Sequence, residues 1–191
     1  MKKIPDHMDN PIDNFLISVC DDISEGFYET GHTPNMITTY SLITGLLSCY
    51  FLYKKNLVLF AVFYFLSYFF DCLDGHFARK YDMATDFGDM YDHAKDLLIL
   101  MLVLYITYKK SYHNINGLIV IIIFLSIFLS MLHLSCQEQN CDEKFKNKNN
   151  GYFQPFIELC GDKENIYWSR FFGTGTLTLV LIALICYVNR P

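Results

Sequence analysis

The sequence has no surplus of positive charge. Its 191 residues include 15 Lys and Arg against 20 Asp and Glu, which gives a formal net charge of −5 at pH 7. Proteins that bind nucleic acid need a basic surface to neutralise the phosphates. We therefore expect no nucleic-acid partner.

The cysteines show no metal-binding pattern. There are seven of them, an odd number, and their spacing matches none of the usual zinc sites. Cys49, Cys72 and Cys186 lie in apolar segments, where a cysteine packs as a small hydrophobic residue. We expect no disulfide framework.

Polar residues are scarce. The chain is 52% hydrophobic and 17% aromatic, and its mean hydropathy is +0.21, which is high for a soluble domain of this size. The N-terminal stretch "MKKIPDHMDN" has no apolar core after its lysines, so we expect no cleavable signal peptide.

Five apolar runs are candidates for membrane spans. A span needs about 20 mostly apolar residues, with a range of about 17 to 25. The runs 36–53, 117–134 and 171–188 meet this requirement alone, whereas 57–75 and 88–108 meet it only if the aspartate-bearing turns at their ends are helical. The sequence predicts an all-α, polytopic transmembrane helix bundle with five spans, or six if the connection 136–170 adds one. That connection is too polar for an ordinary span, although "YFQPFIELC" could dip into the membrane interface. Five buried helices in a soluble protein would leave too little polar surface.

An amphipathic helix is expected before the first span. Apolar residues recur at helical intervals after Pro11, which suits a helix start; they are Ile12, Phe15, Leu16, Val19 and Ile23. This helix can lie on the membrane surface or pack against the bundle. We divide the chain into an N-terminal interfacial segment, 1–35, and a membrane domain, 36–191.

The stretch Phe69–Asp96, "FFDCLDGHFARKYDMATDFGDMYDHAKD", holds seven aspartates and three basic residues. Asp71 and Asp74 are three residues apart and share one helix face; Asp92 and Asp96 are four apart and share another. Because the chain turns between the two helices, all four carboxylates meet at one membrane surface, where ionisable groups are usually functional. Carboxylates that converge in this way repel one another unless cations are bound. We predict two Mg²⁺ or Mn²⁺ ions, which prefer oxygen ligands.

The other residues of this stretch have simpler roles. Asp82 and Asp86 are expected to be solvated in the connection. Asp89 is either a further ligand or a charge that complements the helix N-terminus. Gly75 and Gly88 leave room for a phosphate or for a neighbouring helix.

Read as spacing, the stretch is Asp71-x2-Asp74-Gly75-x2-Ala78-Arg79-x8-Gly88-x3-Asp92-x3-Asp96. This resembles the signature of the CDP-alcohol phosphotransferases, and every fixed position is present over these 26 residues. The likeness extends upstream to "TPNMIT", residues 33–38, where Thr33 can cap a helix that begins at Pro34. The family usually has six spans, so this chain, with five expected spans, departs from the family in the number of spans.

The resemblance implies roles for the site residues. Asp71, Asp74 and Asp92 would bind the metal ions, and Asp96 would contact the second ion and act as general base. The CDP-alcohol would be bound by Gly75, Arg79, Thr85 and the turn Pro34, Asn35, Met36 and Ile37. Gly88 would serve close packing. The resemblance also suggests a homodimer, and the small-residue run "GTGT", residues 173–176, could allow close helix contact.

The resemblance leaves two directions of transfer open. "DGHFAR" is similar to phosphatidylinositol synthases, whereas "GDMYDHAKD" is closer to choline and ethanolamine phosphotransferases. The short chain favours CDP-diacylglycerol as donor and a polar alcohol, inositol-like, as acceptor. The alternative is transfer from CDP-choline or CDP-ethanolamine to diacylglycerol. His76 and His93 are either acceptor contacts or histidines bonded to their neighbours, and His133 is expected to be packed in the bundle.

Two other functions share part of the pattern. A membrane prenyltransferase also uses magnesium carboxylates, but it would lack the Gly-x2-Ala-Arg element and would carry a second aspartate-rich motif. A divalent-cation carrier places its carboxylates in the middle of a span, and a degenerate scaffold would have lost a fixed residue. The chain fits neither pattern.

The distribution of Lys and Arg predicts the orientation. If the aspartate motif faces the cytoplasm, nine basic residues lie inside and five outside. The inside set is Lys2, Lys3, Arg79, Lys80, Lys144, Lys146, Lys148, Lys163 and Arg170, and the outside set is Lys54, Lys55, Lys109, Lys110 and Arg190. We therefore expect an integral membrane protein whose active site faces the cytoplasm.

Overall fold

A computed structural model describes residues 4–141 and 159–190, and its regular elements in these ranges are all helical. They are α1 (Pro11–Glu29), α2 (Pro34–Tyr53), α3 (Leu57–Lys80), α4 (Asp86–Ser111), η1 (Tyr112–Asn114), α5 (Gly117–Asn140), η4 (Lys163–Asn165), α7 (Ile166–Ser169), η5 (Arg170–Phe172) and α8 (Thr174–Val188). The predicted all-α class is confirmed. The stretch "YFQPFIELC" lies almost wholly outside the described residues, as do residues 142–158 of the connection 136–170, so the structure does not describe the place considered for a sixth span.

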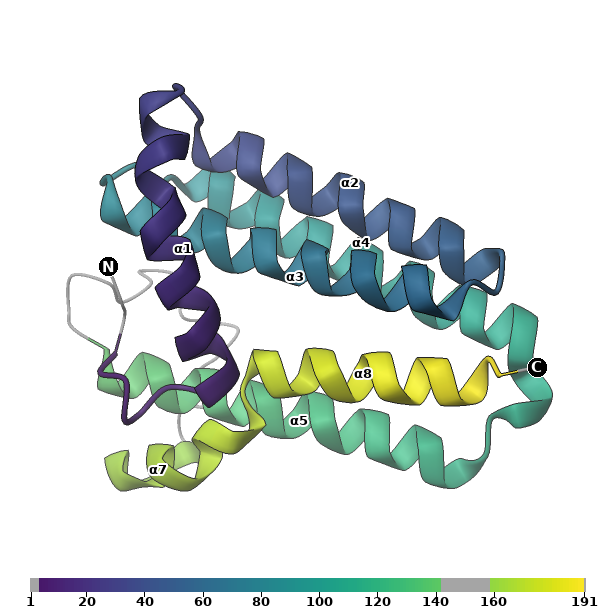
Figure 1. Cartoon of the computed structure of the whole chain (residues 1–191). Coiled ribbons are helices and arrows are strands. Elements are labelled where there is room, and N and C mark those ends of the chain that lie inside the picture. The colour runs from purple at the N-terminus through teal and green to yellow at the C-terminus, as the bar shows by residue number, and fades with distance from the viewer. Residues whose placement is uncertain (1–3, 142–158, 191) are drawn as a thin grey trace.

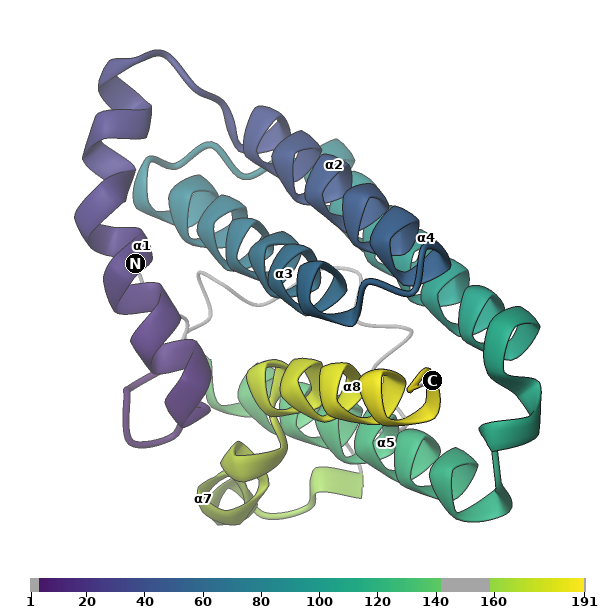
Figure 2. The ribbon, with the colours of Figure 1, turned by 45° about the vertical axis from the view of Figure 1, so that its right-hand side comes forward.

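The long helices form two layers. Helices α2, α3 and α4 lie side by side in one layer, and α5 and α8 make the other (Figure 1). Helix α1 crosses the bundle at the end where α3 stops and α4 begins, as both views show (Figure 2). The aspartate motif therefore lies at the end of the bundle that α1 covers.

Four of the described segments are long and apolar enough to cross a membrane: Pro34–Tyr53, Leu57–Lys80, Gly117–Asn140 and Lys163–Val188. They correspond to four of the five predicted spans. The fifth, α4, is a helix of 26 residues, but charged residues at both ends shorten its apolar part. Lys95 and Asp96 precede that part, and Lys109 and Lys110 follow it.

Side-chain caps fix where the long helices begin. The residue before each of the first five long helices accepts a hydrogen bond from a backbone N–H of the first turn, as Asn and Thr commonly do; these residues are Asn10, Thr33, Asn56, Thr85 and Asn116. The predicted Thr33 cap with Pro34 in the first turn is confirmed. Thr85 caps the start of α4, so its side chain fixes where the second helix of the aspartate motif begins.

Polar contacts dock α1 onto the bundle. The Asn10 amide donates to the Arg170 carbonyl at 2.6 Å and to the Thr176 hydroxyl at 2.9 Å. Asp13 is buried and accepts hydrogen bonds from Tyr68 of α3 and from Thr174 at 3.1 Å. Burial raises the pKa of the Asp13 carboxyl to about 6. The amphipathic pattern allowed this helix to lie on the membrane surface or to pack against the bundle. These contacts show that α1 packs against the bundle.

The small-residue run at the start of α8 makes this docking possible. A Cβ on Gly175 would lie 2.4 Å from Asp13 Oδ1, and one on Gly173 would lie 2.7 Å from Asn10 Cβ. Both glycines are thus used to admit α1 within the chain. The run is not free to contact a second chain, and the prediction of a homodimer now rests on the family resemblance alone.

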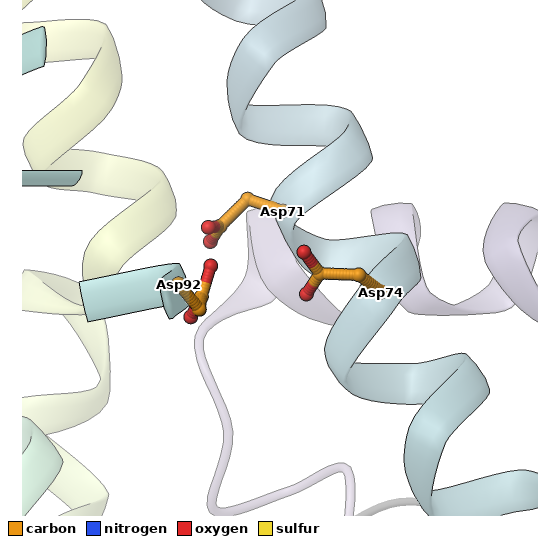
Figure 3. Close-up of side chains that lie close together, drawn as sticks. All are labelled: Asp71, Asp74 and Asp92. Carbon is orange, nitrogen blue, oxygen red and sulfur yellow. The ribbon is translucent and has the colours of Figure 1, made fainter. Parts of the chain in front are cut away.

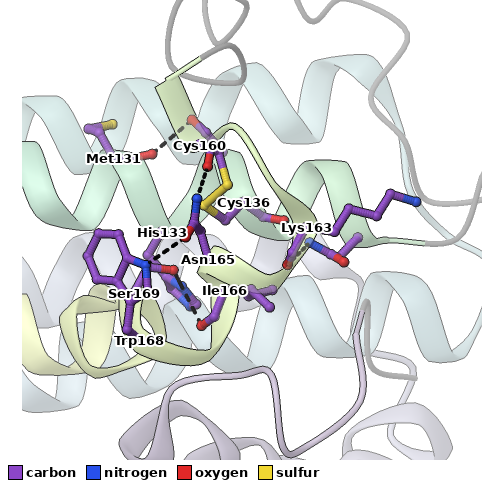
Figure 4. Close-up of a disulfide and its surroundings, with 11 residues drawn as sticks. Met131, His133, Cys136, Cys160, Lys163, Asn165, Ile166, Trp168 and Ser169 are labelled. Carbon is purple, nitrogen blue, oxygen red and sulfur yellow. Dashed lines mark hydrogen bonds between the residues drawn. A yellow bond between two sulfur atoms is a disulfide. The ribbon is translucent and has the colours of Figure 1, made fainter.

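The sequence predicted no disulfide framework, and the described residues contain a single disulfide. Cys136, in the last turns of α5, is bonded to Cys160, whose carbonyl accepts from the Asn165 amide at 2.6 Å (Figure 4). The partners are 24 residues apart in sequence and come together because the described segment that begins at residue 159 packs against α5 through η4 and α7. Such a pairing depends on tertiary structure and could not be deduced from cysteine spacing.

Candidate active site

Three carboxylates converge between α3 and α4. Asp71 and Asp74 lie on successive turns of α3, Asp92 lies on α4, and the three side chains point toward one another (Figure 3). One ligand oxygen from each lies within 4.8 Å of the others. We call Asp71, Asp74 and Asp92 the carboxylate trio. Helix spacing predicted the pairs, and α2, which packs against both α3 and α4, brings the two helices to one site.

The fourth predicted aspartate is joined to the trio through a lysine. Asp96 is not part of the trio, but its Oδ1 lies 2.8 Å from Lys95 Nζ. The same ammonium lies 3.1 Å from Asp92 Oδ1 and donates a hydrogen bond to Asp71 Oδ1. Lys95 therefore links Asp96 to two members of the trio.

The trio fits a hard divalent cation. Its donors are all carboxylate oxygens, which Mg²⁺ and Mn²⁺ prefer. Asp74 is 5% exposed, and its Oδ2 is buried and accepts no hydrogen bond from any residue that the structure describes. A buried anionic oxygen without a partner is costly, and a bound cation would remove that cost.

The start of α2 meets the start of α4 beside the trio. A Cβ on Gly88 would lie 3.0 Å from Asn35 Oδ1 and 3.1 Å from Thr85 Oγ1. Gly88 thus allows Asn35 and Thr85 to approach, as its predicted packing role requires. On α3, a Cβ on Gly75 would lie 3.1 Å from an Arg79 guanidinium nitrogen, so Arg79 folds back over Gly75 toward the trio.

The residues of the predicted nucleotide-binding turn, 34–37, differ in how far they are buried. The side chain of Ile37 is fully buried in a core cluster with Leu73 and Phe77, whereas Met36 is 43% exposed. The Ile37 side chain therefore packs in the core and cannot reach a nucleotide. Next to it, Thr38 is buried close to Asp74 and hydrogen-bonds the Pro34 carbonyl at 3.1 Å. Sequence reasoning missed Thr38, although it lies in the "TPNMIT" element.

The histidines and Asp89 lie outside the trio. His76 is buried and contacts Asp21 of α1 at 2.9 Å. His93 is exposed, and its Nδ1 contacts the Asp89 carbonyl at 2.8 Å. Both His76 and His93 are therefore bonded to neighbouring residues, which was one of the two alternatives that the sequence left open. Asp89 is itself 57% exposed at the start of α4, where its charge complements the helix N-terminus.

His133 is packed in the bundle, as predicted. It is fully buried on α5, its Nδ1 lies 3.1 Å from Ser169 Oγ, and its Nε2 lies 3.1 Å from the Gln137 amide nitrogen. The contact with Ser169 ties α5 to α7.

Comparison with known proteins agrees with this geometry. Residues 31–189 match the family model described as CDP-alcohol phosphatidyltransferase. The chain belongs to this family. It is therefore an enzyme that transfers a phosphate-containing group, and its long apolar helices make it an integral membrane protein. The family match begins after α1 and includes the whole trio.

Two relatives are similar to parts of the chain. A protein of Candida albicans (strain SC5314) named CDP-diacylglycerol–inositol 3-phosphatidyltransferase is 26% identical over 164 residues, which cover 78% of this chain and 71% of that protein. An uncharacterized protein of Aquifex aeolicus (strain VF5) is 36% identical over 64 residues, about a third of each chain (34% and 33%). No solved structure matches.

Proposed function

We propose that the enzyme transfers a phosphatidyl group from CDP-diacylglycerol to a polar alcohol, with an inositol-like acceptor favoured, and releases CMP. The observation that carries the proposal is the carboxylate trio at the end of the bundle, beside Arg79 and the start of α2. The named Candida relative, a phosphatidyltransferase that acts on inositol, favours this acceptor class. The site lies at a helix end, where a lipid donor and a water-soluble acceptor can both reach it.

Each residue has a role in this reaction. Arg79 offers its guanidinium to the diphosphate as a bidentate donor. The trio would hold the divalent cation, which supplies charge stabilisation to the diphosphate and the departing CMP. Asp96 accepts the proton of the acceptor hydroxyl as its oxygen bonds to the phosphatidyl phosphorus. The bond from that phosphorus to the bridging oxygen breaks, and CMP leaves with the electron pair.

The alternative direction uses the same centre. CDP-choline or CDP-ethanolamine would donate its phosphoalcohol to diacylglycerol, which the likeness of "GDMYDHAKD" favours. The two directions differ only in which substrate carries the acyl chains.

A matrix of labelled substrates tests both directions. Purified enzyme with Mg²⁺ or Mn²⁺ is offered CDP-diacylglycerol with inositol, serine or glycerol phosphate, and CDP-choline or CDP-ethanolamine with diacylglycerol. We expect CMP release that requires CDP-diacylglycerol, an acceptor and metal together, with inositol giving the highest rate. CMP release only with CDP-choline or CDP-ethanolamine would establish the alternative, and no release from any pair would contradict the proposed function.

We also propose that the active site faces the cytoplasm, because the basic residues of the connections are more numerous on that side. The disulfide argues for the opposite side, since α5 ends at the same end of the bundle as α3 and disulfides are rare in reducing compartments (Figure 1). Ala84 and Lys54 are exposed in the turns at the two ends of α3. In sealed vesicles of known orientation, a membrane-impermeant maleimide should label Ala84→Cys only from the cytoplasmic side and Lys54→Cys only from the other. The reverse pattern would place the site in the oxidising compartment.

A further inference from the structure

Lys95 is buried among the carboxylates of the site. Its side chain is 1% exposed, although it lies near the end of the bundle. The ammonium nitrogen lies 2.8 Å from Asp96 Oδ1 and 3.1 Å from Asp92 Oδ1, and it hydrogen-bonds Asp71 Oδ1. It also donates to Ser41 Oγ of α2 at 3.1 Å. An ammonium group has three N–H donors and no acceptor, so these oxygens surround it as ligands surround a cation.

The oxygens around Lys95 form a second cation site next to the trio. The trio consists of Asp71, Asp74 and Asp92, and Lys95 contacts Asp71, Asp92 and Asp96. Two carboxylates are thus common to both sets. Shared ligands of this kind are expected where two cations lie about 3.5–4 Å apart, as in two-metal sites. The Lys95 ammonium has the place that a second divalent ion would take.

We propose that Lys95 is a positioning residue that supplies the second cation of this site, so that the enzyme binds one divalent ion, in the trio. The inference rests on the proposed function, because it takes these carboxylates to be the catalytic centre. The Lys95 side chain holds Asp96 beside the trio and partly neutralises the four carboxylates. The family signature fixes no residue at position 95, so this device belongs to the present chain and revises the expectation of two ions.

A purely structural salt bridge would not need this arrangement. Burying a lysine is costly unless a partner compensates its charge, and one carboxylate would serve as that partner. Lys95 instead contacts three carboxylates from both helices that form the site. Its position makes a specific prediction about metal stoichiometry, which an ordinary structural ion pair does not.

The test counts bound Mn²⁺ in the full-length protein in detergent without any donor. We expect one ion per chain in the wild type and two in Lys95→Met, because removal of the ammonium opens the second set of oxygens. The Mn²⁺ resonance spectrum should change from that of an isolated ion to that of an exchange-coupled pair. Lys95→Arg keeps the charge and should still bind one ion. Lys109→Met is the matched control, since Lys109 is exposed at the other end of α4, and it should also bind one.

Each outcome decides the proposal. Two ions in the wild type would mean that the ammonium is displaced by metal, and one ion in Lys95→Met would mean that the second site does not exist; either result overturns the inference. If Lys95→Met unfolds without metal, it is purified in Mn²⁺, and Lys95→Gln is counted beside it. CMP release is measured separately, so that an inactive wild type with the expected change in ion count would contradict the proposed function and leave the role of Lys95 standing.

Discussion

Replacement of Asp96 by Asn is expected to lower the rate of CMP release by about 10²–10⁴-fold, the usual contribution of a general acid or base, without loss of metal binding. Asp96 is not a member of the trio, so the metal ligands are unchanged. An amide has nearly the shape of a carboxylate, and its oxygen can still accept from Lys95. It cannot take a proton from the acceptor hydroxyl. The loss should therefore appear in turnover alone.

The measurement uses CMP release and Mn²⁺ binding on the same preparation. Asp86→Asn is the control, because Asp86 also lies on α4 and is exposed outside the trio; its rate should equal that of the wild type. Unchanged turnover in Asp96→Asn would show that another group is the base. Loss of metal binding in parallel with turnover would make Asp96 a ligand.

The sequence predicted that Asp71, Asp74, Asp92 and Asp96 converge. The structure unites the first three and joins Asp96 to them through Lys95. Spacings of three and four residues place carboxylates on one helix face, and the short connection between α3 and α4 can only bring those faces to the same end of the bundle. The cap at Thr33 was predictable for the same reason, since a capping side chain acts within one turn. Fold class followed from the length and composition of the apolar runs.

The site role of Lys95 was missed because helix spacing predicts only its contacts within α4, and not its contacts with other helices. It lies three residues after Asp92, which predicts contact, but it is directly adjacent to Asp96, and adjacent helix positions do not face each other. Its contacts with Asp71 and Ser41 cross to α3 and α2 and depend on how the three helices pack. Asp13 was missed for a similar reason: its partners Tyr68 and Thr174 are 55 and 161 residues away.

Replacement of Asp71 by Asn is expected to abolish both metal binding and turnover. Asp71 is common to the trio and to the contacts of Lys95, so no other aspartate on α3 has so central a place. Substitution of a residue that hydrogen-bonds a metal ligand typically lowers the metal affinity by about 10–100-fold. Loss of a ligand itself should lower the affinity further. Because a bound cation stabilises the reacting phosphates by several kcal/mol, the rate should fall by about 10³-fold or more.

Asp13→Asn is the matched control for Asp71→Asn. It removes another buried carboxylate at the covered end of the bundle, and it leaves the trio and Lys95 intact. We expect wild-type metal binding and CMP release from it at a temperature where both proteins are folded. Full Mn²⁺ binding in Asp71→Asn would show that the trio is not the metal site. Loss of turnover in both variants would assign the effect to the packing of α1 and α3.

The three site variants are distinguished by the number of Mn²⁺ ions that each binds. Asp71→Asn should bind none, Asp96→Asn one and Lys95→Met two. This order follows from which carboxylates are common to the trio and to the contacts of Lys95.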